Sequence, residues 1–127
     1  MCFKNIVFLA VFLHFLCFTF STNENEEWNV DYTINFSIGK RVEGDRIIQT
    51  NRYHRNETDP FTMTYNYGFP DNGHTIVSYV ELFARQTTPI YKIKFLQGGL
   101  GLREMFIAVA TFNTTSYNLT SYIYGYN

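Results

Sequence analysis

Cysteine is almost absent from this sequence, and both copies fall in one short segment. Cys2 and Cys17 lie within residues 1–21, which have the pattern of a secretory signal peptide. Lys4 supplies a positive start, an apolar run follows, and Thr19-Phe20-Ser21 offers a cleavage site between small residues. We expect cleavage after Ser21, which leaves the mature chain without a thiol. Cysteine nucleophiles, cysteine zinc sites, disulfides and thiol redox chemistry are then excluded from the mature protein.

Charge is scarce as well. Ten basic and eleven acidic side chains give the 127 residues a net charge of −1, and no run of five basic residues occurs. Balanced, scattered charge argues against a dedicated polyanion binder, so we expect no contact with nucleic acid. The apolar run of the signal peptide is too short to span a membrane, so we expect no membrane anchor in the mature chain.

Motifs for catalysis and metal binding are also missing. There is no G-x-S-x-G nucleophile motif, and the two histidines beyond the leader, His54 and His74, form no metal-binding pattern. The acidic pair Glu43 and Asp45 falls in a predicted turn, which explains it without acid–base chemistry. We therefore expect no catalytic residue, no cofactor and no metal, in a protein that is not an enzyme.

Helical patterning is absent from the mature chain, whereas strand patterning is abundant. Aromatic residues reach 19%, with ten Tyr and thirteen Phe, and this composition favours strands. Short alternating runs predict one β domain at residues 28–127, after a flexible acidic leader at 22–27. We expect an all-β fold, an antiparallel β-sandwich or flattened barrel of about seven strands. The predicted strands are 28–38, 46–53, 61–67, 75–83, 90–96, 106–112 and 119–126, with polar loops at 56–60 and 113–118.

Glycine is concentrated at one place, in Gly98-Gly99-Leu100-Gly101. The stretch resembles the start of a phosphate-binding loop, but Glu104 stands where the last glycine should be and a strand follows instead of a helix. We predict that Gly98, Gly99 and Gly101 are structural and bend or reverse the chain between two core strands. Gly125, near the C-terminus, is a fourth candidate structural glycine.

Four N-glycosylation sequons start at Asn35, Asn56, Asn113 and Asn118. Each asparagine falls on a polar strand face or in or beside a predicted loop, where a glycan would have solvent around it. We predict these four as glycosylation sites, consistent with the signal peptide.

The last predicted strand carries Tyr122, Tyr124 and Tyr126 on one face. Tyrosines in such a row serve either as anchors for a partner or as packing residues with polar tips at the rim. Packing is the simpler interpretation.

The chain resembles the insect multiprotein-bridging-factor-two family, which includes the response-to-pathogen (REPAT) proteins. Four segments carry the resemblance: Gly44-Asp45, the strand from Thr75 to Val80, the glycines at 98–101 and the ending Ile123-Tyr124-Gly125. One departure is Phe83-Ala84-Arg85, where family members often carry an acidic residue. The resemblance implies a small secreted protein without known catalytic residues, although the family's founding member is described as a transcriptional coactivator.

These observations lead to three functional hypotheses. The main one is a secreted, extracellular, N-glycosylated, non-enzymatic binding protein with an immune, midgut, salivary or haemolymph role. The first alternative is a transcriptional coactivator that bridges other factors, as the family name implies, and it requires residues 1–21 to be retained or bypassed. The second alternative is a carrier of a small apolar ligand inside an aromatic-rich β-barrel. The expected partner is accordingly a protein or a small apolar ligand.

Overall fold

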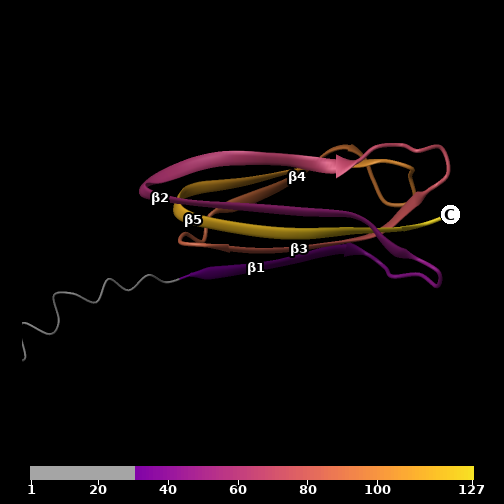
Figure 1. Ribbon diagram of the computed structural model, residues 1–127, viewed down its shortest axis with the longest axis horizontal. Coiled ribbons are helices and arrows are strands. Elements are labelled where there is room, and N and C mark those ends of the chain that lie inside the picture. Colours follow the sequence, from indigo (N-terminus) through magenta and orange to yellow (C-terminus); the bar gives the residue numbers. More distant parts are fainter. Residues whose placement is uncertain (1–30) are drawn as a thin grey trace, which may run out of the picture.

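The computed structural model describes residues 31–127, and this part of the chain forms five β-strands (Figure 1). All strand pairs are antiparallel and belong to one sheet. The order across the sheet is β1-β3-β5-β2, and β4 also pairs with β5. The strands are β1 (Tyr32–Gly39), β2 (Arg46–Phe69), β3 (Ile76–Gln86), β4 (Tyr91–Gly98) and β5 (Met105–Tyr126).

Two long strands, β2 and β5, determine the shape of the molecule. They pair from Arg46 opposite Gly125 to Phe69 opposite Met105, with a register shift between Ile47 and Gln49 and an interruption with further shifts at residues 56–63. Both strands turn back midway, so the single sheet folds over on itself (Figure 1). One half of β5 pairs with β3 and the other with β4. We call the two layers the four-stranded arm (β1, β3, 117–126 and 46–56) and the three-stranded arm (β4, 105–111 and 61–69).

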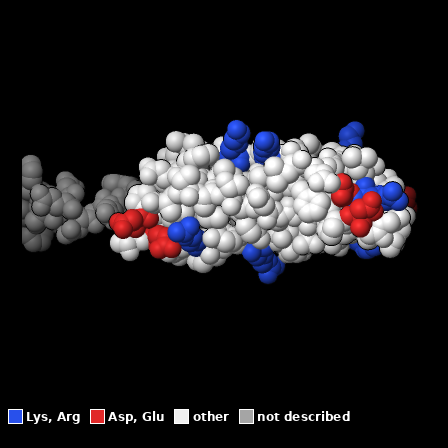
Figure 2. All heavy atoms as spheres, turned by 90° about the horizontal axis from the view of Figure 1, so that it is seen from above, with Lys and Arg blue, Asp and Glu red and all other residues white. Residues whose placement is uncertain are grey.

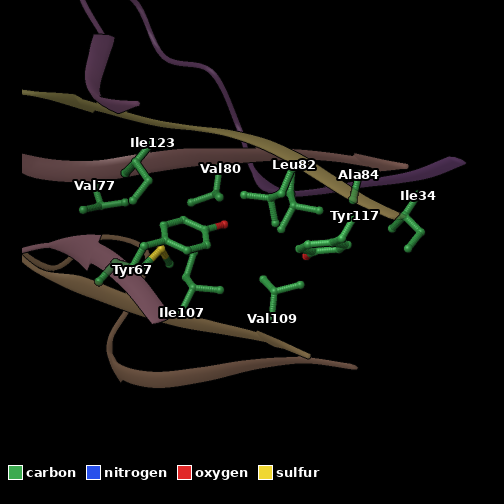
Figure 3. Close-up of a cluster of buried hydrophobic side chains, with 12 residues drawn as sticks. Ile34, Tyr67, Val77, Val80, Leu82, Ala84, Ile107, Val109, Tyr117 and Ile123 are labelled. Atoms are coloured by element: carbon green, nitrogen blue, oxygen red, sulfur yellow. The ribbon is translucent and has the colours of Figure 1, made fainter. Parts of the chain in front are cut away.

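The hydrophobic core lies between the two arms (Figure 3). The three-stranded arm contributes Tyr67 and Ile107, and the four-stranded arm contributes Val80 and Leu82, all of them buried. Full burial of an aliphatic side chain of this size stabilises the fold by about 1.5–3 kcal/mol. The Tyr67 hydroxyl also donates a hydrogen bond to Ser121 Oγ on the other arm, at 2.8 Å. Alternation along the strands directs these side chains inward, as the sequence predicts.

A buried polar network holds the bend of β5. The Gln86 side chain donates from Nε2 to the carbonyl oxygens of Thr88 (2.6 Å) and Ile90 (3.0 Å), and its Oε1 accepts a hydrogen bond from Thr111 Oγ1 at 2.9 Å. Beyond this point Asn113 adopts a positive φ of 56°. Asparagine tolerates this conformation better than most residues, so the strand changes direction without a glycine. The network ties the bend to the connection between β3 and β4.

The structure confirms the all-β, antiparallel class but corrects the strand count. Residues 56–60 and 113–118, predicted as loops, lie inside β2 and β5, so seven predicted segments become five strands. Pro60 is compatible with a strand here because β2 lies at an edge of the sheet, where a missing N–H is tolerated. The sheet is not closed into a barrel. The predicted signal peptide and residues 22–27 lie outside the described residues, as does the predicted strand start at Trp28.

Gly98 is the last residue of β4, and Gly99 and Gly101 lie in the connection from β4 to β5. Gly98 and Gly101 have φ values of 72° and 77°, in the region that favours glycine. A Cβ at Gly98 would overlap the backbone carbonyl of Glu104, whereas one at Gly101 would meet open space. Gly99 N donates a hydrogen bond to Glu104 O at 2.9 Å, which closes the turn. The steric constraint in this turn therefore falls mainly on Gly98.

Candidate functional site

The sequence segments that carry the family resemblance meet at one end of the molecule. Gly101 N donates a hydrogen bond to Val77 O at 2.8 Å, which joins the glycine turn to the start of β3. Ser78 Oγ donates to Asp45 Oδ2 at 3.2 Å, which joins the turn before β2 to the same place. Gly125 is packed so closely there that a Cβ would lie 2.7 Å from Ile76 O. Residues far apart in the sequence thus form one structural unit.

The Asp45 carboxylate is the polar centre of this unit. It accepts hydrogen bonds from Arg41 Nε at 2.9 and 3.0 Å and from Val42 N at 2.9 Å, in addition to Ser78. The Asp45 side chain is only 2% exposed, while that of Arg41 is 51% exposed. Hydrogen bonding from Arg41, more than from Val42 and Ser78, lowers the pKa of Asp45 to about 2. The turn at residues 41–45 is therefore fixed on the sheet.

Arg41 connects this turn to an aromatic surface. Its guanidinium carbon lies 3.9 Å from the centroid of the Tyr124 ring, in a cation–π contact. The Tyr79 and Tyr124 rings pack with centroids 5.5 Å apart, and the Tyr124 hydroxyl donates to Glu81 Oε2 at 3.3 Å. Tyr124 is therefore a packed residue, only 9% exposed, with its polar tip bonded.

More aromatic and apolar side chains extend the same outer surface of the four-stranded arm. Register places Tyr79 beside Tyr124, and Glu81 beside Tyr122. Phe83 and Ile47 are the most open apolar members, at 44% and 48% exposure. A hollow of about 140 Å³ lies beside Phe83. We call this surface the tyrosine face and define it by Arg41, Ile47, Tyr79, Glu81, Phe83, Tyr122 and Tyr124.

The sequence anticipated only part of this face. Alternation along the last strand placed Tyr122 and Tyr124 together. Tyr79, Glu81 and Phe83 of β3 also alternate with buried residues, and this alternation in the sequence indicates that the three side chains share the outer surface. No local pattern shows that Arg41 lies over a ring 83 positions later in the chain.

The four sequon asparagines are exposed but do not gather at one place. Asn35 and Asn118 lie on the outer surface of the four-stranded arm, and Asn56 and Asn113 lie at the bend. Asn56 is engaged by its neighbours, since its Oδ1 accepts a hydrogen bond from Ser116 Oγ at 2.7 Å. Glycosylation at these positions stays a prediction.

Within residues 31–127 no three His, Cys, Asp or Glu side chains come together in a way that could hold a metal ion. His54 and His74 lie on separate segments, in β2 and in the connection to β3. The described residues contain no helix long and apolar enough to cross a membrane.

A comparison with protein families gives a match to the family model described as "Transcription activator MBF2", over residues 38–125. The match runs from the end of β1 almost to the end of β5 and includes the tyrosine face. No curated protein and no solved structure matches the chain.

This match corrects two expectations from the sequence. The main hypothesis of a secreted, glycosylated binding protein is wrong, because the matching family is one of transcription activators and gives no support to secretion or glycosylation. The expectation of no nucleic-acid contact is overturned as well, since transcription activation takes place on DNA and involves nucleic-acid or protein partners. The family resemblance itself is confirmed, though not membership of the REPAT group. The chain belongs to the MBF2 transcription activator family.

Proposed function

We propose that this protein is a non-enzymatic transcriptional coactivator that bridges other factors. The observation that carries the proposal is the match to the MBF2 transcription activator family over residues 38–125. No observation among the described residues favours the alternative of a small-ligand carrier, since the inner faces of the arms pack against each other as a core.

The tyrosine face supports the proposal as a surface for one protein partner. Tyr, Phe and Arg are the residue types enriched where protein interfaces derive most of their binding energy. Arg41 is held in place by Asp45 and by the Tyr124 ring, so little side-chain freedom is lost when a partner binds. Phe83 and Ile47 provide apolar area that is open to a partner.

A reporter assay in cells that lack the endogenous protein tests the function and the face together. The wild-type protein should raise activator-dependent transcription of a reporter gene. The double variant Phe83→Ser, Tyr122→Ser should lose most of this stimulation while keeping its thermal unfolding midpoint. Ile90→Ser is the matched control, because Ile90 is 58% exposed but lies in the connection between β3 and β4.

Each outcome of this assay has a separate meaning. If the double variant stimulates transcription as well as the wild type, the tyrosine face is not the contact surface. If the wild type stimulates no activator in nuclear extract or in cells, the proposed function itself is refuted.

The cellular location of the protein decides whether the proposed function is possible. Residues 1–21 still predict an extracellular location, and a coactivator must retain or bypass them. N-terminal sequencing of the protein from nuclear and extracellular fractions distinguishes the two. A single species that starts near Thr22 and occurs only outside the cell would refute the coactivator function.

A further inference from the structure

On the side of β5 away from β2, the four-stranded arm has two strands, β3 and β1, whereas the three-stranded arm has only β4. β3 and β4 both pair with β5 on the side away from β2, one in each arm. β1 then lies beyond β3 in the four-stranded arm, but no strand of residues 31–127 lies beyond β4 in the three-stranded arm. Phe36 of β1 reaches Phe95 of β4, with ring centroids 6.3 Å apart. The position beside β4 and opposite β1 is therefore open to another strand.

The edge of β4 is suited to strand addition. Its eight residues pair with β5 only, so half of the main-chain N–H and C=O groups face outward without a partner from the described chain. Its inward side chains remain unusually open. Tyr91 is 45% exposed and Phe95 is 37% exposed, although both share the face of the buried Val109 and Ile107. A strand added beside β4 would cover these side chains.

The outer face of β4 carries only basic charge. Lys92 and Lys94 are both exposed, and neither has a carboxylate within ion-pair distance in the described chain. Their neighbours across the sheet are Ala110 and Ala108 on β5, and the next neighbours, on β2, are uncharged as well. Figure 2 looks onto this side of the molecule, where acidic side chains gather at the two ends and the middle shows basic ones alone. The face therefore favours a negatively charged partner.

We propose that the outer edge of β4 binds an extended segment of a partner protein in which acidic residues alternate with apolar ones. Main-chain hydrogen bonds to β4 supply part of the affinity, as in other cases of strand addition. The acidic side chains lie beside Lys92 and Lys94, and the apolar ones lie beside Tyr91, Ile93 and Phe95. Because side chains alternate between the two faces of a strand, the segment can bind only in the register that places its acidic residues on the lysine side and its apolar residues on the core side.

A second copy of the chain fits this edge poorly. Two β4 edges paired antiparallel about a two-fold axis would bring Lys92 and Lys94 of one copy beside those of the other. Like charges opposite each other in neighbouring strands are destabilising. The charge pattern therefore selects a partner of the opposite sign.

The role of this edge as the second partner site of a bridging factor rests on the proposed function. It lies on the arm opposite the tyrosine face, so one molecule could hold two partners at once. Binding at the edge is nevertheless measurable without transcription. A protein that binds the segment and fails in the reporter assay would refute the proposed function and leave this inference standing, and the reverse result would refute this inference alone.

The test uses the full-length protein and synthetic eight-residue peptides. The probe alternates Glu and Val, and the control peptides alternate Lys and Val or place all Glu residues in one block. Fluorescence anisotropy should detect binding of the alternating Glu peptide only, and its affinity should fall as salt is raised. Amide exchange should slow at residues of β4 on binding, which side-chain contact alone would not produce.

Charge reversal provides the decisive variant. The double change Lys92→Glu, Lys94→Glu should weaken binding of the Glu peptide by about tenfold or more, because two attractions become two repulsions. The same variant should gain affinity for the Lys peptide. Arg52→Glu, an exposed change on β2, is the matched control and should leave both affinities unchanged.

Four results would overturn the inference. One is no binding of the Glu peptide at millimolar concentration, and another is unchanged binding after charge reversal. A third is self-association that charge reversal enhances or abolishes while the peptide has no effect. The fourth is duplex DNA binding that depends on Lys92 and Lys94 and is not competed by the peptide, which would assign the surface to nucleic acid instead.

Discussion

Two tyrosine hydroxyls in the core should respond to removal in opposite directions. The Tyr117 hydroxyl is buried and has no hydrogen-bond partner among residues 31–127, in a side chain only 1% exposed. The Tyr67 hydroxyl is also buried but donates to Ser121 Oγ at 2.8 Å. Each can be deleted by a change to phenylalanine, which keeps the ring and its packing.

The magnitudes follow from the state of each hydroxyl. An unpaired buried hydroxyl costs about 1–3 kcal/mol, so Tyr117→Phe should raise the free energy of unfolding by about 1 kcal/mol or more. A satisfied buried hydrogen bond contributes about 0.5–1.5 kcal/mol, so Tyr67→Phe should lower it by about 1 kcal/mol. Ser121 Oγ keeps its own bond to Glu81 O at 2.9 Å, which limits the loss.

Urea denaturation followed by far-UV circular dichroism measures both changes. The midpoints should move to opposite sides of the wild type with unchanged m-values. In thermal unfolding, about 1 kcal/mol corresponds to about 4–8 °C for a domain of this size. If Tyr117→Phe destabilises the protein, its hydroxyl has a partner, and the assignment of an unpaired group in the core is refuted. Shifts of the same sign for both variants would refute the contrast between them.

Three further predictions test other parts of the structure. Gly98→Ala should destabilise the fold by about 3 kcal/mol and Gly101→Ala by about 1 kcal/mol, because only the first Cβ meets a carbonyl oxygen; equal losses in chemical denaturation would contradict this. The lowered pKa of Asp45 implies stability that is present above pH 3.8 and is lost toward pH 2, so Asp45→Asn should flatten the acid limb of a stability–pH curve; an unchanged limb would refute the role of Asp45. Burial raises the pKa of Tyr67 to about 12, so the unfolded chain ionises first and the fold should lose about 2–3 kcal/mol of stability between pH 10 and 12; Tyr67→Phe should remove that part of the alkaline slope, and a slope equal to that of the wild type would count against it.

Alternation of apolar and polar residues predicted several of the strand segments, because one face of each arm packs on the core and the other faces solvent. It failed at the two bends, where Asn113 and Pro60 belong to residue types that usually end strands. At these bends, contacts between distant segments decide the conformation. The Gln86 network and the edge position of β2 allow the strands to continue. Such contacts between distant segments leave no mark in the local sequence.

The candidate site likewise combines features that local alternation predicts with features that depend on contacts between distant segments. Period two places Tyr122 and Tyr124 on one face, and the exposed Lys92 and Lys94 also follow from alternation. The position of Asp45 beside Ser78 does not, because it depends on how two connections meet at one end of the sheet. Sequence patterns thus predicted faces, whereas the contacts that fix Arg41 on its face required the three-dimensional structure.

The position of β5 in the sheet has a consequence for the life of the newly made chain. This strand comes last in the described sequence, yet it pairs with β2, β3 and β4. Until it is synthesised, β2 has no strand beside it and the apolar faces of β3 and β4 lack their main neighbour. Assembly of the full sheet therefore waits for residues 105–126 and then requires many pairings between distant segments, which is a slow step. Until β5 is available, the unpaired earlier strands are open to chaperones and proteases.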